Sequence, residues 1–339
     1  MRRPPLRTIA ELANVSEPTV SRVLNGRSGV ATATRDRVID ALASLGVTDV
    51  PDPRHHRRNV VGIVSGELTN PVFATFAHHF GAEFAKRGHV TTLVENVPQT
   101  STEDRCIDEF LAAGLDGIVF VGGRHAEHDE SLDRYERLIA QGTPIVLVNG
   151  RENDLACPRI YCDERAGAVK AVTHLRQLGH RRIGCLLGSS RYVPTRRFID
   201  GWSATMTGAG LDAPDDFVVE SVFTLEGGRA GATRLLDRGV TGIVAGNDLM
   251  ALGAIHAATS AGLEVPDQLS VVGYDGTEFT TFTNPPLTTL RQPFEDMARL
   301  VAEALVSEAS GDHRFREQYV FEPVLVARGS TGGFDNVAE

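Results

Sequence analysis

The sequence has no apolar run that approaches the roughly 20 residues a membrane-spanning helix needs. Its first residues, MRRPPLRTIAELANVS, contain neither the apolar segment nor the small-residue cleavage site of an export signal. The four cysteines (Cys106, Cys157, Cys162 and Cys185) form no C-x-x-C pair, so ordinary reduced thiols in the core are the favoured interpretation. These absences argue against a membrane partner, and we expect a soluble, cytoplasmic protein.

The motifs of common nucleotide-binding and hydrolytic enzymes are also missing. There is no G-x-x-x-x-G-K-S/T phosphate loop, no G-x-G-x-x-G turn and no G-x-S-x-G nucleophile elbow. His125 and His128, with Glu127 and Asp129, come nearest to a metal site. Nothing there has the spacing of a closed site, and a solvated loop is the favoured interpretation. We therefore expect no catalytic activity, no cofactor and no bound metal.

The charge of the chain is divided unevenly along its length. The net charge of −10 at first argues against a nucleic-acid partner. Residues 1 to 58, however, carry ten arginines and six acidic residues, a balance of +4, so the remaining residues carry −14. A basic N-terminal segment on an acidic body indicates a polyanionic partner for the segment and a separate task for the body, whose field should repel DNA.

From residue 60 onward, short β-branched runs alternate with amphipathic segments. Runs this short and apolar are typical of strands buried on both faces of a parallel sheet. We predict two sets of four strands: residues 60–64, 90–94, 117–121 and 145–148, then 183–187, 218–222, 242–245 and 270–274. Apolar residues at every third or fourth position predict helices such as 73–86, 102–113 and 166–178, several of which stop at a glycine, as at Gly88, Gly114 and Gly179.

This alternation predicts two similar α/β lobes, each built on a doubly wound parallel sheet. In such folds a ligand binds at the carboxyl ends of the strands, here between the lobes. The segments that follow the predicted strands carry amide, carboxylate, guanidinium and aromatic groups: Phe73, Asn149, Arg151, Arg196, Arg197, Phe223, Asn247 and Asp275. This mixture suits a small polyhydroxylated or heterocyclic ligand, with hydrogen bonds at its edge and stacking on its face.

Residues 8 to 25, TIAELANVSEPTVSRVLN, predict two short helices joined by a tight turn. The apolar face of the first helix contains Ile9, Ala10, Leu12 and Ala13. Asn14 tolerates the left-handed conformation that ends a helix, and Ser16 is the expected N-cap of the next. A third helix from about residue 32 closes the core. This pattern predicts a helix-turn-helix, whose second helix enters the DNA major groove; a plain helical hairpin is the alternative.

Two parts of the N-terminal segment carry a specific resemblance: Val15-Ser16-x-x-Thr19-Val20-Ser21-Arg22-Val23-Leu24-Asn25-Gly26, and behind it Thr34-Arg35 with Leu45-Gly46. They resemble the DNA-binding segment of the lac repressor family (LacI/GalR-type transcriptional regulators). The body resembles later blocks of the same family, in order, at Asn70-Pro71-x-Phe73, Gly114-Leu115-Asp116-Gly117, Leu178-Gly179-His180, Asn247-Asp248-x-Met250, Val272-Gly273-Tyr274-Asp275 and Val326-Ala327-Arg328-Gly329. The resemblance spans about residues 6 to 331.

The resemblance implies a definite division of the chain. An all-α helix-turn-helix domain is expected at residues 1–46, a linker or hinge at 47–59, a bilobal periplasmic-binding-protein-like core at 60–331 and a tail at 332–339. Lobe one is expected at about 60–158 and 291–320, and lobe two at about 159–290 and 321–331. The C-terminal residues contain no heptad repeat for tetramer formation, so a dimer is expected.

The resemblance also implies a function. Proteins of this family are homodimers that bind a pseudo-palindromic operator in double-stranded DNA and change their DNA affinity when a small effector opens or closes the cleft. We therefore expect a sequence-specific transcriptional regulator, a repressor, that responds to a sugar. A purine, a nucleoside or another non-sugar effector would use much the same groups. A solute-binding protein of similar bilobal fold is less favoured, because it needs an export signal and no helix-turn-helix.

Carried over by position, the resemblance makes Glu17, Pro18 and Arg22 the base-reading residues. Arg22 suits a bidentate contact to guanine, Glu17 can accept from cytosine N4, and Pro18 offers only an apolar contact, for example to a thymine methyl. Phosphate contacts, which set register without specifying sequence, would come from Ser16, Thr19, Ser21, Asn25 and Thr34.

The linker departs from the family pattern. The family has a Pro-Asn start and an Ala-x-x-Leu hinge helix whose leucine wedges into the minor groove, whereas residues 48–58 are TDVPDPRHHRR. Without a leucine, kinking of the operator centre by this segment is in doubt. Contacts of Arg54, Arg57 and Arg58 with DNA are one interpretation, and a flexible charged spacer is the other.

In the cleft, Asp275 is the foremost candidate for an effector contact, since a carboxylate can accept from two adjacent hydroxyls; helix capping is the alternative. Arg196 or Arg197 should supply the family's effector-binding arginine, although the spacing to Gly201 is one residue longer than R-x-x-G. Phe73 and Phe223 are expected to be stacking surfaces, or else simple core. Asn149, Arg151 and Asn247 complete the expected set, and Asn247 with Asp248 has helix capping as its alternative role.

Overall fold

The computed structural model describes residues 4–24, 30–45, 47, 59–96, 102–152 and 154–334. It divides into two compact units, Met1–Arg58 and Asn59–Glu339. Asn25, Arg54, Arg57 and Arg58, with most of the predicted linker and the tail from residue 335, lie outside the described residues. Within the described part, no helix combines the length and the apolar character needed to cross a membrane.

The N-terminal unit contains three helices, α1 (Leu6–Ala13), α2 (Glu17–Leu24) and α3 (Thr32–Ser44). Its core side chains are at most 7% exposed: Ile9, Ala10, Ala13, Val20, Val23, Val38, Ala41 and Leu42. The prediction that Leu12 faces this core is wrong, since Leu12 is 55% exposed. At 3.6 residues per turn, Leu12 lies about 100° around the helix from the centre of the stripe formed by residues 9, 10 and 13.

The turn between α1 and α2 confirms the predicted helix-turn-helix. Asn14 ends α1 in the left-handed conformation, with a φ of 50°. The amide of Val15 donates to the carbonyl of Ala10 at 3.0 Å. The hydroxyl of Ser16 accepts from the amide of Thr19 at 3.4 Å, so Ser16 caps the start of α2. These contacts fix the angle at which the second helix leaves the first.

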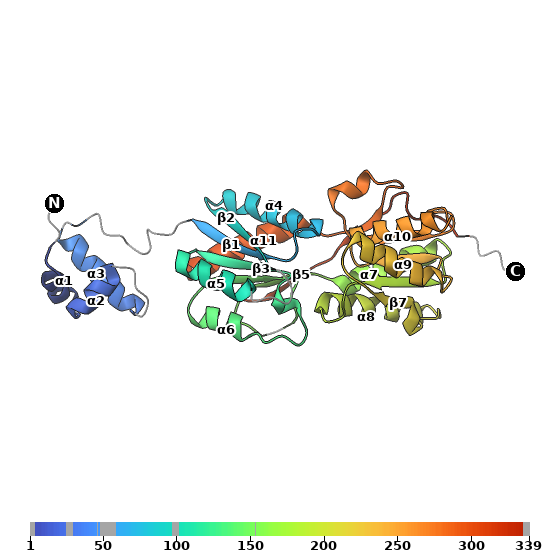
Figure 1. The fold of residues 1–339 in the computed structure, drawn as a ribbon. Coiled ribbons are helices and arrows are strands. Elements are labelled where there is room, and N and C mark those ends of the chain that lie inside the picture. Colours follow the sequence, from blue (N-terminus) through green and yellow to red (C-terminus); the bar gives the residue numbers. More distant parts are fainter. Residues whose placement is uncertain are drawn as a thin grey trace. The chain divides into compact units, whose positions relative to one another are not determined.

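The C-terminal unit has two lobes, each with a six-stranded sheet covered by helices on both faces (Figure 1). In lobe one the strand order is β11-β5-β4-β3-β1-β2 and all pairs are parallel. Its strands are β1 (Val60–Ser65), β2 (Val90–Glu95), β3 (Gly117–Val121), β4 (Ile145–Val148), β5 (Arg159–Cys162) and β11 (Gln318–Phe321). One face packs against α4 (Pro71–Ala85) and α11 (Phe294–Ser310), and the other packs against α5 (Thr102–Ala113) and α6 (Asp133–Ala140).

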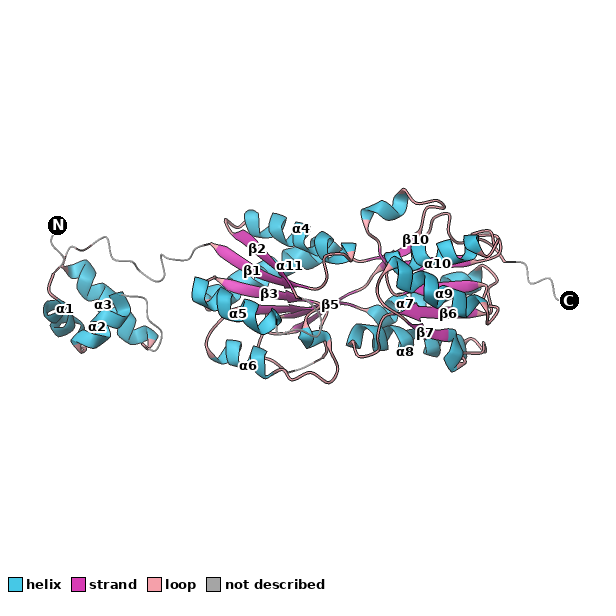
Figure 2. Ribbon diagram, viewed as in Figure 1, coloured by secondary structure: helices cyan, strands magenta, loops and turns pink. Residues whose placement is uncertain are grey.

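Lobe two has the strand order β12-β10-β9-β8-β6-β7, in which only the β10–β12 pair is antiparallel. Figure 2 shows its strands in magenta and its helices in cyan. Its strands are β6 (Ile183–Leu187), β7 (Val218–Glu220), β8 (Gly242–Ala245), β9 (Ser270–Asp275), β10 (Thr288–Arg291) and β12 (Val324–Val326). Its helices are α7 (Glu164–Gln177), α8 (Val193–Gly208), α9 (Leu225–Leu236) and α10 (Asp248–Ser260), with short 3-10 turns η2 (Asp215–Phe217) and η3 (Glu278–Thr281). The two lobes confirm the expected fold class.

All eight predicted strands are present, and four more (β5, β10, β11 and β12) were not predicted. Strand β5 belongs to the first sheet, where Leu147 pairs with Arg159. The chain therefore first crosses to lobe two after Cys162, not at residue 159. Among the described residues it crosses at three places: at Asp163, at Gln292–Pro293 and at Glu322–Pro323.

Large apolar side chains fill both lobes. Phe76, Phe80 and Phe84 of α4 are fully buried under the first sheet, and each contributes about 1.5–3 kcal/mol by leaving water. Trp202 of α8, buried to 1% exposure, donates its ring N–H to the carbonyl of Ile183 at 3.2 Å. The four cysteines are buried, free thiols. These cores hold the two sheets as rigid bodies on either side of the crossings.

Candidate DNA-contacting helix and effector cleft

Helix α2 presents the predicted base-reading residues to solvent. Glu17, Pro18 and Arg22 are exposed, whereas Val20 and Val23 are at most 1% exposed. The predicted phosphate-contacting residues surround them: Ser16 is exposed, and Thr19, Ser21 and Thr34 are half-buried. The outer face of the second helix therefore offers a guanidinium, a carboxylate and an apolar ring, groups that suit contacts with base edges.

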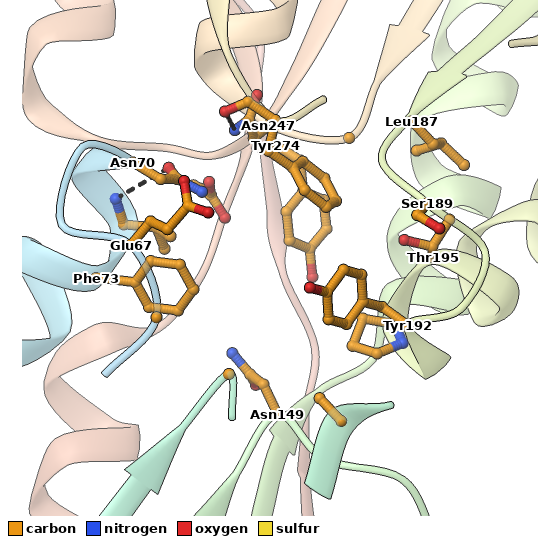
Figure 3. Close-up of a pocket in the computed structure, with 18 of the residues that line it drawn as sticks. Glu67, Asn70, Phe73, Asn149, Leu187, Ser189, Tyr192, Thr195, Asn247 and Tyr274 are labelled. Carbon is orange, nitrogen blue, oxygen red and sulfur yellow. Dashed lines mark hydrogen bonds between the residues drawn. The ribbon is translucent and has the colours of Figure 1, made fainter. Parts of the chain in front are cut away.

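The second site is a cleft of about 610 Å³ between the two lobes of the C-terminal unit. It lies at the carboxyl ends of strands from both sheets, as the sequence predicted. Its walls contain predicted and unpredicted residues, among them Glu67, Asn70, Phe73, Asn96, Asn149, Glu164, Ser189, Arg191, Tyr192, Thr195, Phe198, Phe223, Asn247, Tyr274, Asp275 and Gln292. In Figure 3, Asn70 and Phe73 of lobe one face Ser189 and Thr195 of lobe two across the cavity.

An aromatic ring lies over glycine on each side of the cleft. Phe73 covers Gly66 and Gly122, where an added Cβ atom would lie only 2.4 and 2.6 Å from the ring. Phe223 covers Gly188 in the same way, with an added Cβ only 2.0 Å from its ring. Both rings line the cleft. Each lobe therefore contributes one aromatic surface of the kind that stacks on a flat or sugar-like ligand.

Asp275 stands at the end of β9, where it lines the cleft and is 5% exposed. Its carboxylate accepts from Nε2 of Gln292 at 2.8 Å. Burial and the nearby carboxylate of Asp248 raise the pKa of Asp275 well above its ordinary value. Its φ of 102° turns the backbone sharply, and Gly276 follows with a φ of 72°. Helix capping, the alternative role, is not what this side chain does, since η3 begins only after Thr277.

The two predicted asparagines both line the cleft. Asn247 also caps α10, because its Oδ1 accepts from the amide of Met250 at 2.8 Å, and its Nδ2 donates to the carbonyl of Phe223 at 3.3 Å. Asn149 accepts from the amide of Cys162 at 3.4 Å and has a φ of 56°. Both amides are thus held in place by the backbone beside the cleft.

The three predicted arginines do not line the cleft, so this part of the expectation is wrong. Arg151 donates to the carbonyls of Glu127 and His128, at 3.5 and 2.5 Å. Arg196 donates to the carbonyl of Ser190 at 2.5 Å. From outside the cavity, Arg151 and Arg196 hold loop carbonyls, and Arg197 donates to the carboxylate of Glu164, which lines the cleft.

Helix phase explains where Arg197 lies. Gly201 is the point of closest approach of α8 to α7, since a Cβ there would lie 2.5 Å from the carbonyl oxygen of Arg165. Arg197 precedes Gly201 by four residues, one turn earlier on the face toward α7. The position three residues before Gly201 is Phe198, which lines the cleft with its ring 5.8 Å from that of Tyr274. The longer spacing was therefore the signal that the R-x-x-G arginine is replaced here by an aromatic residue.

The arginine that does line the cleft is Arg191, in the loop after β6. It donates to Glu127 of lobe one at 3.3 Å and to the hydroxyl of Tyr192 at 2.9 Å. The amide of His128 donates to the carbonyl of Arg191 at 2.8 Å, and Glu127 and Tyr192 form a β-bridge. The loops after β3 and β6 are thus joined across the cleft. The position of this segment after a strand predicts that it borders the cleft, but the sequence does not show that Arg191, and not Arg196 or Arg197, lines the cavity.

The loop that carries Glu127 is held by a buried polar network. Glu103 accepts from the hydroxyl of Tyr135 at 2.5 Å, and from Nδ2 of Asn96 and the amide of Arg124 at 3.0 Å each. The amide of His125 donates to the hydroxyl of Tyr135 at 3.0 Å. These bonds fix η1 (Arg124–Ala126) against lobe one. The network thereby fixes where the cleft-lining loop begins.

His125 itself corrects the expected solvated loop, because it is fully buried. Its Nε2 lies 2.9 Å from the carbonyl of Val148, and burial lowers the pKa of the imidazole, which favours its neutral form. His128 is exposed and pairs with Asp129. The part of the chain that the structure describes contains no group of three or more metal-ligating side chains.

Carboxylates outnumber cations around the cleft. Glu67, Glu127, Glu164 and Asp275 line it, against Arg191, which is paired with Glu127. Burial raises the pKa of Glu127, and it raises the pKa of Glu164 to about 7. An anionic ligand would add charge repulsion to this desolvated site. The chemistry of the wall therefore suits an uncharged ligand with many hydroxyl groups.

A helix-turn-helix joined to a two-lobed ligand-binding unit defines a transcriptional regulator with its own sensor domain. Comparison with known proteins agrees. The model of bacterial regulatory proteins of the lacI family matches residues 5–48, and that of the periplasmic binding protein-like domain matches residues 172–331. The HTH-type transcriptional regulator MalR of Streptomyces coelicolor is 43% identical over 330 residues, which cover 96% of each chain. The chain belongs to the lacI family of bacterial regulatory proteins, whose members are transcriptional regulators and not enzymes.

Solved structures of transcriptional regulators have the same fold as this chain. The transcriptional regulator CelR in complex with cellobiose superposes with a TM-score of 0.72 and 30% identity, over 97% of this chain and all of that one. The lac repressor dimer bound to operator and an anti-inducer superposes with a TM-score of 0.70 and 25% identity, over 98% of this chain and all of that one. The resemblance inferred from the motifs therefore extends over the whole architecture.

Proposed function

We propose that the protein is an operator-binding repressor whose DNA affinity is controlled by an uncharged sugar of disaccharide size bound between the lobes. The observation that carries this proposal is the pair of aromatic surfaces, Phe73 in lobe one and Phe223 in lobe two. Two separate stacking surfaces in a cleft of about 610 Å³ fit two linked rings better than one. The amide and carboxylate groups of Asn149, Asn247 and Asp275 fit hydroxyl groups at the edges of such rings.

The proposed mechanism couples two sites. A sugar that contacts both lobes stabilises one angle between them, and the lobes of a homodimer then present the two helix-turn-helix units at a different separation. Half-sites lie about 34–36 Å apart, or a multiple of that, so a change of separation changes operator affinity. A regulator that acts on operator DNA in this way works in the bacterial cytoplasm.

The dimer is proposed to form through exposed apolar side chains found on both lobes. Val90 and Leu93 of the edge strand β2 are 66% and 39% exposed. In lobe two, Leu225 and Phe282 are 38% and 82% exposed. Exposed apolar side chains mark a protein interface where they form a contiguous patch, and the proposed dimer joins these side chains into one such surface. The lac repressor, whose structure is that of a dimer, has the same fold.

A thermal-denaturation screen tests the proposed ligand class. The panel contains cellobiose, maltose and other neutral disaccharides, with glucose, sugar phosphates and purine nucleosides as the contrasting classes. A ligand at 100 times its Kd adds about 2.7 kcal/mol to stability, which is seen as a rise in Tm. We expect a disaccharide to raise Tm more than glucose and the sugar phosphates to have no effect. Stabilisation by nucleosides alone would reject the sugar proposal.

Replacing Arg22 by alanine is expected to cost about 1–3 kcal/mol of operator affinity and to relax the preference at one base pair, because one bidentate guanine contact is lost. Operator sequences selected from a random DNA pool, followed by titration of single-base variants, measure both effects. Arg7→Ala is the matched control, since Arg7 is exposed on α1 and pairs with Glu11. An equal loss of affinity on every sequence would assign Arg22 to phosphate contact instead.

A further inference from the structure

Glu164 is the first residue of α7 and immediately follows the first crossing between the lobes, at Asp163. It is 5% exposed, yet it lines the cleft. Its carboxylate accepts from Nη1 of Arg197 at 3.4 Å. The carboxylate of Glu164 therefore lies between the cavity and the guanidinium of Arg197, at a point where the chain passes from one lobe to the other.

Arg197 connects Glu164 to lobe one. Its guanidinium lies over the ring of Tyr161 in β5, 4.2 Å from the ring centroid, and its Nη2 lies 3.9 Å from Glu152. This Nη2 is buried and makes no hydrogen bond within the described structure. Arg197 thus belongs to lobe two by sequence and contacts both lobes, and its hydrogen-bonding capacity is only partly used.

Two residues of the cleft wall, Thr195 and Gln292, have unused polar atoms. The hydroxyl of Thr195 and Oε1 of Gln292 are buried without a hydrogen-bond partner among the described residues, and both residues line the cleft. Gln292 lies at the second crossing, as Glu164 lies at the first. The cleft therefore presents unsatisfied polar atoms beside two of the segments that join the lobes, and buried polar atoms of this kind are strongly stabilised by a ligand that pairs with them.

We propose that Glu164 is a specificity residue of the effector site, whose carboxylate accepts a hydrogen bond from a sugar hydroxyl, and that Arg197 is a positioning residue that acts through Glu164. The inference rests on the proposed function, because it assumes a ligand with hydroxyl groups. Arg197 holds the carboxylate toward the cleft and stacks on Tyr161, so the same contact that recognises the sugar is linked to the angle between the lobes. Arg197 itself does not touch the sugar.

The pH dependence of sugar binding follows from the surroundings of Glu164. The groups that face it are Arg197 of α8, Asp163 at the start of α7, Tyr161 and Cys162 of β5, and Tyr274 of β9. Burial raises the pKa of Glu164 to about 7 in the empty cleft. A hydroxyl that donates to the carboxylate favours its ionised form, so sugar affinity must fall as the pH drops below 7. Between pH 8 and pH 6 we expect a loss of about tenfold from this group.

The test compares Glu164→Gln with wild type, using the disaccharide from the screen that raises Tm most, with cellobiose and maltose as the first probes. Isothermal titration at pH 6, 7 and 8 should show affinity for the variant lowered about 10- to 100-fold at pH 8. The sugar affinity of the variant should also lose the change near pH 7 that the wild type shows. Any contribution of Asp248 and Asp275 to the pH dependence is the same in the two proteins. Glu226→Gln is the matched control, a first-turn glutamate of α9 that is 73% exposed and pairs with Arg229.

Variants of Arg197 test the positioning role. In Arg197→Gln the cation beside Glu164 is lost, so the midpoint of the pH step should move to higher pH; Arg197→Lys should restore most of it. A merely structural arginine would change stability without moving this midpoint. Glu164→Asp keeps the carboxylate but shortens its reach, and it should weaken binding while retaining a pH step.

The outcomes separate the two hypotheses. Operator binding without sugar shows that each variant is folded. If Glu164→Gln binds the disaccharide as wild type does, with the same pH profile, the assignment of Glu164 is wrong and the sugar site stands. If no neutral disaccharide binds the wild-type protein, the proposed function is rejected together with this inference.

Discussion

Replacing Asp275 by asparagine is expected to lower sugar affinity by about 100-fold, or roughly 3 kcal/mol, and to abolish the response of operator binding to sugar. Asp275 is the carboxylate at the end of β9, held by Gln292 at 2.8 Å in a nearly dry part of the cleft. An amide of the same shape keeps the contact with Gln292 possible but has one acceptor oxygen instead of two. Two adjacent hydroxyl groups can then no longer be held together.

Titration calorimetry with the disaccharide probe measures the affinity, and fluorescence anisotropy of labelled operator DNA measures the response. Operator affinity in the absence of sugar should equal that of wild type, because the helix-turn-helix is a separate compact unit. Asp267→Asn, an exposed aspartate of the same lobe outside the cleft, is the control for the substitution itself. Sugar binding by Asp275→Asn with wild-type affinity would remove Asp275 from the effector site.

Replacing Phe282 by aspartate is expected to convert the dimer into monomers and to weaken operator binding by at least about 100-fold, because two linked DNA-binding units bind far more tightly than one. Phe282 is 82% exposed, the most exposed of the large apolar residues in the described structure. A carboxylate there would be buried without a partner in a homodimer interface, at a cost that an interface of ordinary size does not overcome.

Sedimentation analysis reports the assembly state, and anisotropy titration reports operator affinity. Val320→Asp is the matched control: Val320 is 48% exposed on β11, at the opposite edge of the lobe-one sheet from β2. The control should remain dimeric with unchanged operator affinity. A dimeric Phe282→Asp protein would show that this part of lobe two lies outside the interface.

The strands that the sequence predicts are those that their own residues identify, without reference to a partner strand. Each of the eight contains a short β-branched or apolar run, and most of them are buried on both faces, so composition alone distinguishes them from the helices around them. The exceptions are β2 and β7, which are partly exposed. Strands β5 and β11, by contrast, alternate buried or half-buried with more exposed residues and pair with each other across about 160 residues of chain, as in Gln318 with Arg159. Nothing in either segment alone identifies its partner, so both were missed and the boundary between the lobes was placed one strand too early.

The candidate site divides in the same way. Phe73, Asn149, Phe223, Asn247 and Asp275 follow strands directly or begin the next helix, so the topology of the sheet fixes their place and the sequence predicts them. The arginines were misplaced because their direction depends on helix phase and on loop contacts. In α8, Gly201 sets which face meets α7, and this turns Arg197 away from the cleft. The family motif R-x-x-G places its arginine three residues before the glycine, whereas Arg197 lies four residues before Gly201. One added residue rotates the side chain by about 100° around the helix, so the motif no longer predicts which way the arginine points.

The three crossings at Asp163, Gln292–Pro293 and Glu322–Pro323 restrict how the two sheets can move. At one end β5 lies beside β11, where the amide of Asp163 donates to the carbonyl of Phe321 at 2.7 Å, and at the other end β10 lies beside β12. Three adjacent segments anchored in two rigid bodies allow rotation about a common axis but resist sliding and separation. The relative position of the lobes then has essentially one degree of freedom. A ligand that fixes a single angle fixes the entire arrangement, so a few hydrogen bonds in the cleft are enough to select one state of the whole C-terminal unit.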